Sequence, residues 1–589
     1  MKRRLSILAL SLAVVMSLTA CGGNSNTGDT SGSTTSAAGS STSAESTSGA
    51  AATGFDFAKY KVDFTKATDA SKSPKVALDR KDSMVIGVSD TTGIFSVLFG
   101  DNSYDWYMCY TMFDFNIDPD FDGKAIPAAT DFTISDDGLK YTFTIKDGVK
   151  YWDGNPATAK DLEFIYYVLA DPKYDGPSDI TKANIKGLDA YKNGTATTIE
   201  GLKVVNDKTL EITCDKASGA AIFNLQVPLM EKSHYGADFK KGDAAKVKEK
   251  LSTPMGTGQY KFVEYKPGQE LKLVANENYF KGAPKIKNLI FSITPEGQEL
   301  QRVTAGETDI DMATVSPDNM TAAKNAGFIE VMRFPTNGFG YVSFNQADPK
   351  YKDVKVRQAL MYALNRKAVV EKVYGEYANV VNIPESNVSW AYDDEGANTY
   401  DFDLDKAGQL LDEAGWTLNA NGKREKDGKV FTIKFSCMPQ NAVTDIMVPV
   451  MKDDYAKLGI DMTIENLDWP TLQEKSSKKQ LEAYFLAAGL TPDPDSSLAN
   501  VFKSKGSQNY VSYNNPKIDE LYAKGLAEIT VEARKPIYKE IYKILNNDLP
   551  FLYVYQRSDM WVANARIQGY ETSSFREFFY NIYKCEISK

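Results

Sequence analysis

Residues 136–161 read DDGLKYTFTIKDGVKYWDGNPATAKD, and this stretch is the most informative one about the fold. Tyr141–Ile145 alternates aromatic or aliphatic residues with threonine, which is the pattern of a half-buried strand. Asp137-Gly138 and Asp153-Gly154 lie on either side of it, and Asp-Gly pairs favour tight turns in which the glycine takes a positive φ. We therefore expect a strand of antiparallel sheet bounded by two turns.

Further short strands are expected on both sides of this stretch. Each is a short run rich in apolar and β-branched residues. The expected strands are Met84–Val88, Thr209–Thr213, Lys261–Tyr265, Leu271–Ala275 and Leu289–Ile293.

Helices are expected between the later strands. From Asp353, a residue suited to cap a helix N-terminus, apolar side chains recur at helical spacing as far as Leu364. A second helix is expected at 405–414 with Gly415 as its C-terminal cap, and a third at 533–547. Because helices and strands are interspersed, the sequence favours α/β lobes over an all-β sandwich.

The N-terminal residues have the features of an export signal. A basic start (residues 2–4) precedes Leu5–Leu18, an apolar stretch that is too short for a membrane-spanning helix. The sequence LTAC at 18–21 resembles the bacterial lipobox, in which the cysteine thiol is joined to diacylglycerol and the chain is cleaved before it. We expect residues 1–20 to be a signal peptide and Cys21 to be a lipidation site, so that the chain is anchored to the membrane without spanning it.

A flexible linker is expected after this cysteine. Residues 22–53 are almost wholly Gly, Ser, Thr, Ala and Asn, and only Asp29 and Glu45 are charged. Such a composition cannot bury enough surface to offset its ordering entropy. We take 21–73 as the lipid-anchored linker and place the start of the globular body near Pro74.

Composition restricts the class of protein. At 589 residues the chain is long enough for more than one core, since single cores stop growing near ~250–300 residues. The net charge of −10 argues against a nucleic-acid partner, because neutralising phosphate requires Lys and Arg. The remaining cysteines are scattered, so we expect buried free thiols, with one bridged pair as the alternative. They are Cys109, Cys214, Cys437 and Cys585.

The sequence offers little for catalysis. His234 is the only histidine, which excludes a zinc site built from several histidines, and we expect it to have a surface or loop role. A Ser-His-Asp triad would depend on His234, yet the body has no G-x-S-x-G elbow. Phosphate-binding loops of the GxxxxGK[ST] and G-x-G-x-x-G types are also missing. We therefore expect a protein that is not an enzyme and needs no cofactor.

One acidic run is a candidate metal site. Asp118-x-Asp120-x-Asp122-Gly123 matches the first half of a calcium loop, but Ala129 stands where the bidentate glutamate would be. We favour a turn and expect no metal. A glycosidase carboxylate pair stays open as an alternative, because the chain has 78 acidic residues and none of their pairs is marked as special.

Six motifs, taken together and in order, resemble the bacterial extracellular solute-binding proteins of family 5, the oligopeptide, dipeptide and nickel group. The resemblance covers essentially residues 80–570. Its motifs are 136–143, 149–161, Gly256–Tyr260, Tyr265–Gly268 with Asn278–Phe280, Gly306–Ile310 and Asp353–Leu360. These motifs identify a fold rather than a pocket: we expect Arg357 to be a structural ion-pair partner and Trp152 to be a packing residue.

The resemblance implies a two-lobed α/β fold of the periplasmic-binding-protein type (type II, cluster C), with an extra small domain in the first lobe. Two crossing strands would join the lobes, and we place them near Asn337–Asn345 and Leu549–Gln556. The expected parts are lobe I at 74–115, 201–345 and 549–589, the small domain at 116–200 and lobe II at 346–548.

The resemblance also implies where a ligand would bind. In peptide-binding relatives an aspartate three residues before an acidic-Pro pair anchors the peptide amine, but here Leu490 stands at that place. Either Asp493 or Asp495 takes over this role, or the ligand has no free amine there. In those relatives a strand corresponding to Ala487–Leu490 pairs with the ligand, and Thr92–Ser96 would face it. The predicted ligand-binding residues are Gly93, Ile94, Phe95, Trp106, Tyr341, Trp469, Ala487, Ala488, Gly489, Leu490 and Asp493.

The implied function is capture of an extracellular solute, with an oligopeptide expected, for an ABC importer. Its partners would be permease subunits and separate ATPase subunits, and the protein would be a monomer anchored to the outer face of the cell membrane. An oligosaccharide or another polar solute is the alternative, with stacking faces from aromatic residues such as Tyr107. A peptide-sensing receptor and an extracellular hydrolase are two further alternatives.

Overall fold

The computed structural model describes residues 55–89, 91–100 and 102–588. Its main feature is a mixed sheet of thirteen strands. Along the main path the strands follow the order β20 (Asp461–Asn466), β19 (Thr432–Cys437), β21 (Ala483–Gly489), β14 (Gly338–Phe344), β22 (Phe551–Asn564), β12 (Ile310–Ala313), β2 (Ser83–Val88), β11 (Asn288–Ile293), β10 (Glu270–Ala275) and β9 (Tyr260–Lys266). Three more strands lie off this path: β1 (Asp63–Thr65), β13 (Ile329–Pro335) and β15 (Ala378–Val380).

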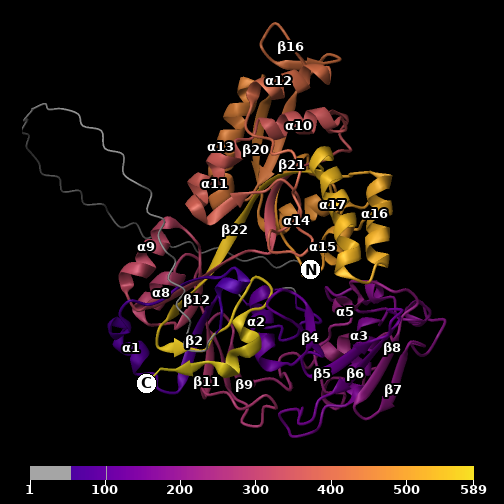
Figure 1. Cartoon of the computed structure of the whole chain (residues 1–589), viewed down its shortest axis with the longest axis vertical. Helices are drawn as coiled ribbons and strands as arrows, with labels where there is room; N and C mark the ends of the chain where they lie inside the picture. The colour runs from indigo at the N-terminus through magenta and orange to yellow at the C-terminus, as the bar shows by residue number, and fades with distance from the viewer. Residues whose placement is uncertain (1–54, 90, 101, 589) are drawn as a thin grey trace, which may run out of the picture. The chain divides into compact units, whose positions relative to one another are not determined.

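The long strand β22 connects two halves of this sheet (Figure 1). Its first half pairs with β14 and β15, and its second half pairs with β12 and β13. We call the half with β2 and β9–β13 the first lobe and the half with β14, β15 and β19–β21 the second lobe. Each lobe has its own large cluster of buried apolar side chains, so each has its own core.

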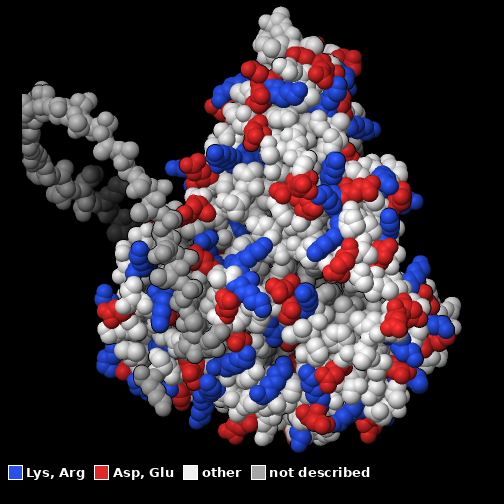
Figure 2. Space-filling model, viewed as in Figure 1, with Lys and Arg blue, Asp and Glu red and all other residues white. Residues whose placement is uncertain are grey.

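Helices pack around both halves of the sheet. Those of the first lobe include α1 (Lys75–Leu78), α2 (Ser103–Met112), α8 (Glu299–Ala305) and α9 (Pro317–Ala326). Those of the second lobe are α10 (Val354–Tyr362), α11 (Arg366–Tyr374), α12 (Leu404–Glu413), α13 (Ala442–Lys457), α14 (Trp469–Ser477), α15 (Pro494–Phe502), α16 (Pro516–Ala527) and α17 (Val531–Asp548). On the visible face, acidic and basic side chains are interspersed over these elements (Figure 2).

A separate four-stranded antiparallel sheet carries the opening motif. Its order is β5 (Thr130–Ile134), β6 (Lys140–Ile145), β8 (Thr209–Thr213) and β7 (Leu202–Asn206), and α3 (Ala159–Leu169) packs on β7 and β8. We call 116–219 the small domain. The predicted boundary at residue 200 is therefore too early, because it separates β7 and β8 from the strands they pair with.

The predicted strands and helices are present with shifts of a few residues at their ends. β6 buries Tyr141, Phe143 and Ile145 and leaves the residues between them partly or fully exposed, as the alternation indicated. Gly138 and Gly154 have positive φ values of 67° and 97°.

Capping residues were also predicted correctly. Asp353 caps α10 by accepting a hydrogen bond from the Lys355 backbone N–H at 2.9 Å, and Gly415 follows α12 with φ of 82°.

Two further predictions about the body are wrong. The linker does not extend to residue 73, because β1 pairs with β13 and Phe57 and Val62 are buried. Arg357 is structural but not an ion-pair partner, since its guanidinium donates to backbone carbonyls, among them those of Tyr351 and Asp548.

Cys109, Cys214, Cys437 and Cys585 are all buried free thiols, as expected. The predicted signal peptide, the predicted lipidation site Cys21 and residues 22–54 lie outside the described residues. Within the described ranges, the structure has no helix long and apolar enough to cross a membrane.

Candidate functional site

The C-terminal half of β21 has an open edge. On one side β21 pairs with β14 along its whole length, from Ala483↔Phe344 to Gly489↔Gly338. On the other side β19 pairs only with Ala483 and Tyr484. Within the part of the chain that the structure describes, no strand pairs with this edge beyond Tyr484.

The register shows which backbone groups this edge presents. The Leu490 N–H donates to the Asn337 carbonyl at 2.8 Å, so this pair is hydrogen bonded. Bonding directions alternate along an antiparallel pair, so Leu486 and Ala488 also bond to β14. The N–H and C=O groups of Ala487 and Gly489 then point to the open edge. Ala487 and Gly489 are exposed, and a Cβ at Gly489 would meet no atom within 4 Å.

A cavity of about 340 Å³ lies on one face of β14 and β21, and we call it the β21 cavity. Phe339, Tyr341, Leu486 and Ala488 share this face because they occupy opposed positions of the two strands. The ring of Tyr341 stacks on that of Phe551 with 4.2 Å between the ring centroids. The lining is therefore largely aromatic and aliphatic.

The turn that follows β21 is tied down by one arginine. Arg534 donates to both carboxylate oxygens of Asp493, at 2.6 and 3.0 Å, and to one oxygen of Asp495 at 2.7 Å. Asp493 also caps α15 by accepting from the Asp495 N–H at 3.0 Å. All three side chains are buried, and burial raises the pKa of the Asp495 carboxyl. Neither aspartate lines the β21 cavity, so neither replaces the amine anchor there.

The first-lobe segment Thr92–Ser96 is shaped by a buried carboxylate. Asp105 of α2 accepts hydrogen bonds from the backbone N–H groups of Thr92 and Gly93, at 3.0 and 3.2 Å. Gly93 has φ of 74°, where a side chain would be strained and a Cβ would meet the ring of Tyr265. The conformation of this loop is thus fixed by hydrogen bonds, but none of its residues lines the β21 cavity.

The aromatic candidates fall into different environments. Phe95 is 1% exposed and packs against Phe262 and Tyr265 in the first-lobe core, so it offers no stacking face to a ligand. Trp106 is half-buried and donates its indole N–H to the Gly100 carbonyl at 2.9 Å. Trp469 is 47% exposed at the start of α14.

A second cavity of about 560 Å³ lies near the carboxyl ends of the parallel strands β2, β11 and β12. Tyr374 and the charged residues Glu299, Arg557 and Asp559 are part of its lining. Arg557 and Asp559 form an ion pair at 3.2 Å, and burial raises the pKa of Asp559. Ligands of open α/β sheets commonly bind at such carboxyl ends.

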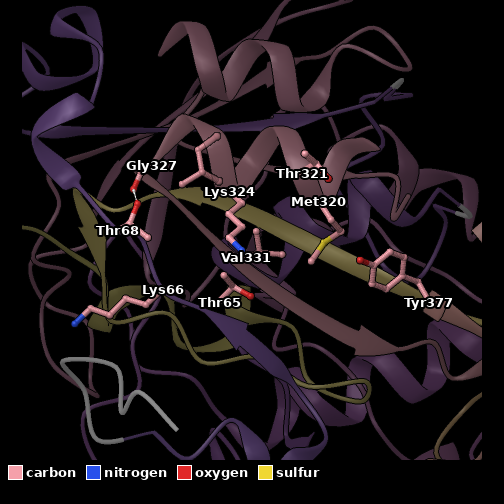
Figure 3. A pocket seen from close by; sticks show the side chains of 10 residues that line it. Thr65, Lys66, Thr68, Met320, Thr321, Lys324, Gly327, Val331 and Tyr377 are labelled. Carbon is pink, nitrogen blue, oxygen red and sulfur yellow. Dashed lines mark hydrogen bonds between the residues drawn. The ribbon is translucent and has the colours of Figure 1, made fainter. Parts of the chain in front are cut away.

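A third cavity, of about 360 Å³, lies between α9, β13 and the segment after β1 (Figure 3). Lys66 and Lys324 line it, and the Thr68 hydroxyl donates to the Gly327 carbonyl at 3.4 Å. None of the predicted ligand residues lies here.

The structure brings together Tyr341, Ala488, Gly489 and Leu490 around the β21 cavity, with Ala487 on the neighbouring edge. It does not bring Gly93, Ile94, Phe95, Trp106, Trp469 or Asp493 to this cavity.

Sequence reasoning missed most of the lining, including Lys182, Tyr484 and Tyr510. Tyr484 belongs to the same strand as the predicted residues and could have been found from strand alternation. Lys182 had no such signal, because only the fold brings it near β21.

The acidic run at Asp118 forms a turn, as favoured. Asp120 accepts hydrogen bonds from the N–H groups of Asp122 and Lys124, at 2.9 and 2.7 Å. Asp118 pairs with Arg576 at 3.2 Å. Within the described residues no group of acidic, histidine or cysteine side chains could hold a metal ion.

The chain is similar in sequence to known solute-binding proteins. Residues 127–509 match the family model described as bacterial extracellular solute-binding proteins, family 5 Middle. The chain is 29% identical over 465 residues to the oligopeptide-binding protein AppA of Bacillus subtilis, covering 77% of this chain and 82% of AppA. It is also 29% identical over 467 residues to heme-binding protein A of Haemophilus influenzae, covering 77% and 83%.

Solved structures show the same fold. The structure of B. subtilis AppA in complex with a nonapeptide matches with a TM-score of 0.73 and 25% identity, over 87% of this chain and 99% of AppA. The neighbours are type II periplasmic binding proteins, so the predicted fold class is confirmed.

Proposed function

The chain belongs to the bacterial extracellular solute-binding proteins of family 5, and from this premise we propose that it captures an oligopeptide for an ABC importer. The observation that carries the proposal is the open edge of β21. An extended peptide can add to such an edge as a further strand, using its own N–H and C=O groups. Because those bonds involve only backbone, they give affinity to peptides of many sequences.

Capture would involve a change in the angle between the lobes. The chain passes between them at Thr336-Asn337 and along β22, and these passages are joined by the Thr336 N–H donating to the Arg557 carbonyl at 2.9 Å. Two short passages side by side can act as a hinge, whose residues absorb the φ/ψ change. A ligand that contacts both lobes only in the closed state would shift the population toward that state.

Delivery and location follow from the same proposal. Cys21 would carry the lipid that holds the protein at the outer face of the membrane, with residues 22–54 as the tether. The protein would act as a monomer, pass its ligand to permease subunits and depend on separate ATPase subunits. It would have no catalytic activity of its own.

An oligosaccharide is the second candidate solute. The stacked rings of Tyr341 and Phe551 in the β21 cavity favour it, because sugar faces pack on aromatic rings. An oligosaccharide cannot add to β21 as a strand, however, and would leave the open edge without a role.

The substitution Ala487→Pro tests the role of the edge. Proline removes the Ala487 N–H, which points away from β14, so the hydrogen bonds between β21 and β14 stay in place. We expect affinity for a pool of short peptides, measured by calorimetry on the full chain, to fall about tenfold or more, as for the loss of a hydrogen bond to a ligand. The melting temperature of the ligand-free protein should change little.

The matched control is Ala487→Ser, which keeps the N–H and adds only a hydroxyl. It should bind the pool like the parent protein. Equal peptide affinity of Ala487→Pro and Ala487→Ser would show that the edge does not hold the ligand.

A further inference from the structure

The β21 cavity contains one charged side chain among the described residues that line it, and that side chain is basic. Lys182 belongs to the short helix Ile180–Ala183 of the small domain and reaches α15 of the second lobe. Its Nζ donates to the Ser496 carbonyl at 3.4 Å, which is a long hydrogen bond. Within the described ranges, no carboxylate oxygen lies within 4.0 Å of this Nζ, so Lys182 forms no ion pair there.

The acidic groups nearest to this cavity are already bound by an arginine. Asp493 and Asp495 share Arg534 in a buried network, and Asp495 also accepts a hydrogen bond from the hydroxyl of Tyr538. Moving either carboxylate into the cavity would remove one of the two buried ion-pair partners of Arg534, which is unfavourable. The cavity therefore has no anionic group to offer a cation.

Leu490 adds an apolar side chain to a cavity that has no anionic group among its described lining residues. It lines the cavity at the place where the family resemblance implies an amine-anchoring aspartate. Its backbone is fixed, because its N–H donates to the Asn337 carbonyl and its own carbonyl accepts from the Asn337 side chain, both at 2.8 Å. Its apolar side chain cannot neutralise an ammonium group, and burying such a group unpaired is costly.

The rest of the lining suits an aromatic group. Tyr341, Tyr484, Tyr510 and Phe551 contribute rings to a cavity of about 340 Å³, and ligand cavities of about 300 Å³ and above accommodate small organic groups. Aromatic rings pack favourably on one another in offset or edge-on geometry.

We propose that the β21 cavity selects solutes in which an aromatic group lies next to a carboxylate, and rejects a free ammonium group at this place. The proposal rests on the peptide-capture function above. The carboxylate would pair with Lys182, the aromatic group would fill the cavity, and the preceding ligand backbone would lie along the edge of β21. A peptide with a C-terminal aromatic residue has this chemistry, whether or not its amino terminus is blocked.

The test compares forms of one tetrapeptide, Ala-Ala-Ala-Phe, titrated calorimetrically into the full chain. The forms are acetylated with a free carboxylate, acetylated and amidated, and free amine with an amidated C-terminus. We expect the first form to bind about tenfold or more tightly than the other two, since hydrogen bonds to charged groups are the stronger class. The acetylated acid Ala-Ala-Ala-Ala should bind more weakly than its Phe counterpart.

Lys182→Met removes the charge and keeps the length of the side chain. It should abolish the advantage of the free carboxylate while leaving affinity for the amidated peptide unchanged, which also shows that the cavity is intact. Lys186→Met is the matched control: Lys186 lies four positions further on in the same domain and pairs with Glu200 at 2.5 Å on the surface. It should behave like the parent protein. Leu490→Asp should reverse the preference toward the free amine.

The outcomes separate the two proposals. Tighter binding of the amine form, or equal loss for both peptide forms in Lys182→Met, would overturn the selectivity while leaving peptide capture in place. Binding of none of the peptides would overturn peptide capture, and the selectivity with it.

Discussion

At the turn between β21 and α15, one arginine pairs with two buried carboxylates, and a third carboxylate nearby forms no ion pair within the described residues. Glu385 is 1% exposed and accepts a hydrogen bond from the Tyr542 hydroxyl at 2.5 Å. Burial raises the pKa of its carboxyl to about 7, and the charge of Asp493 contributes to the same shift. At neutral pH this residue is thus poised between its charged and neutral forms.

The effect on stability has a definite sign. The ordinary pKa of glutamate is 4.5, so between pH 4.5 and 7 the folded chain holds a proton that the unfolded chain releases. The contribution of Glu385 to folding is therefore present at pH 5, is lost as the pH rises to 7, and stays lost above it. We expect Glu385→Gln, which cannot ionise, to be more stable than the parent at pH 8 by roughly 2–3 kcal/mol, with the difference shrinking toward pH 5.

Thermal unfolding at pH 5, 6, 7 and 8 measures this difference. Glu395→Gln is the matched control, because Glu395 is exposed in the same segment and pairs with Lys539 on the surface. Its curve should stay parallel to that of the parent. A constant offset between Glu385→Gln and the parent across this pH range would show that Glu385 does not titrate there.

At the scale of elements, the motif Gly256–Tyr260 is explained by a close backbone approach. The Gly258 N–H donates to the Met112 carbonyl at the end of α2, at 2.9 Å. A Cβ on Gly258 would lie 2.3 Å from the Met112 carbonyl carbon. The motif thus joins α2 to the start of β9, which is a packing role rather than a ligand-binding one.

We expect Gly258→Ala to lower the free energy of unfolding by ~2 kcal/mol or more, because backbone cannot move aside as a flexible side chain can. Chemical denaturation of the full chain measures this. Gly489→Ala is the control, since a Cβ there meets nothing within 4 Å, and it should change stability by less than ~0.5 kcal/mol. Similar stability of the two variants would contradict the close approach.

Elements were predictable from sequence to the extent that local patterns determine them. The alternation at Tyr141–Ile145 and the cap at Asp353 needed no tertiary information. The start of the body was misplaced, because the edge of β13 that recruits Asp63–Thr65 lies hundreds of residues away in the chain. Arg357 was misassigned because nothing local shows that its partners are carbonyls near residue 548.

The site was predictable only in part for the same reason. The resemblance located Ala487–Leu490, and the fold then showed which edge of β21 is open. Lys182 belongs to the small domain and contacts α15 beside the cavity. Asp493 is held outside the cavity by its hydrogen bonds to Arg534. Both effects depend on residues distant in sequence, so only the structure could show them.

At the scale of the whole molecule, the continuous sheet through β22 links the two lobes, each with its own core. This arrangement permits the lobes to move as units about β22 and Thr336-Asn337. Ligand binding should then stabilise the molecule as a whole, because it adds contacts that the unfolded chain lacks.

The most direct test of peptide capture is thermal unfolding of the ligand-stripped full chain with a pool of short peptides and, separately, with a pool of glycans. Ligand at about 100 times its Kd adds about 2.7 kcal/mol of stability, which is a measurable rise in melting temperature. We predict a rise with the peptides and none with the glycans. A rise with the glycans alone, or with neither pool, would contradict peptide capture.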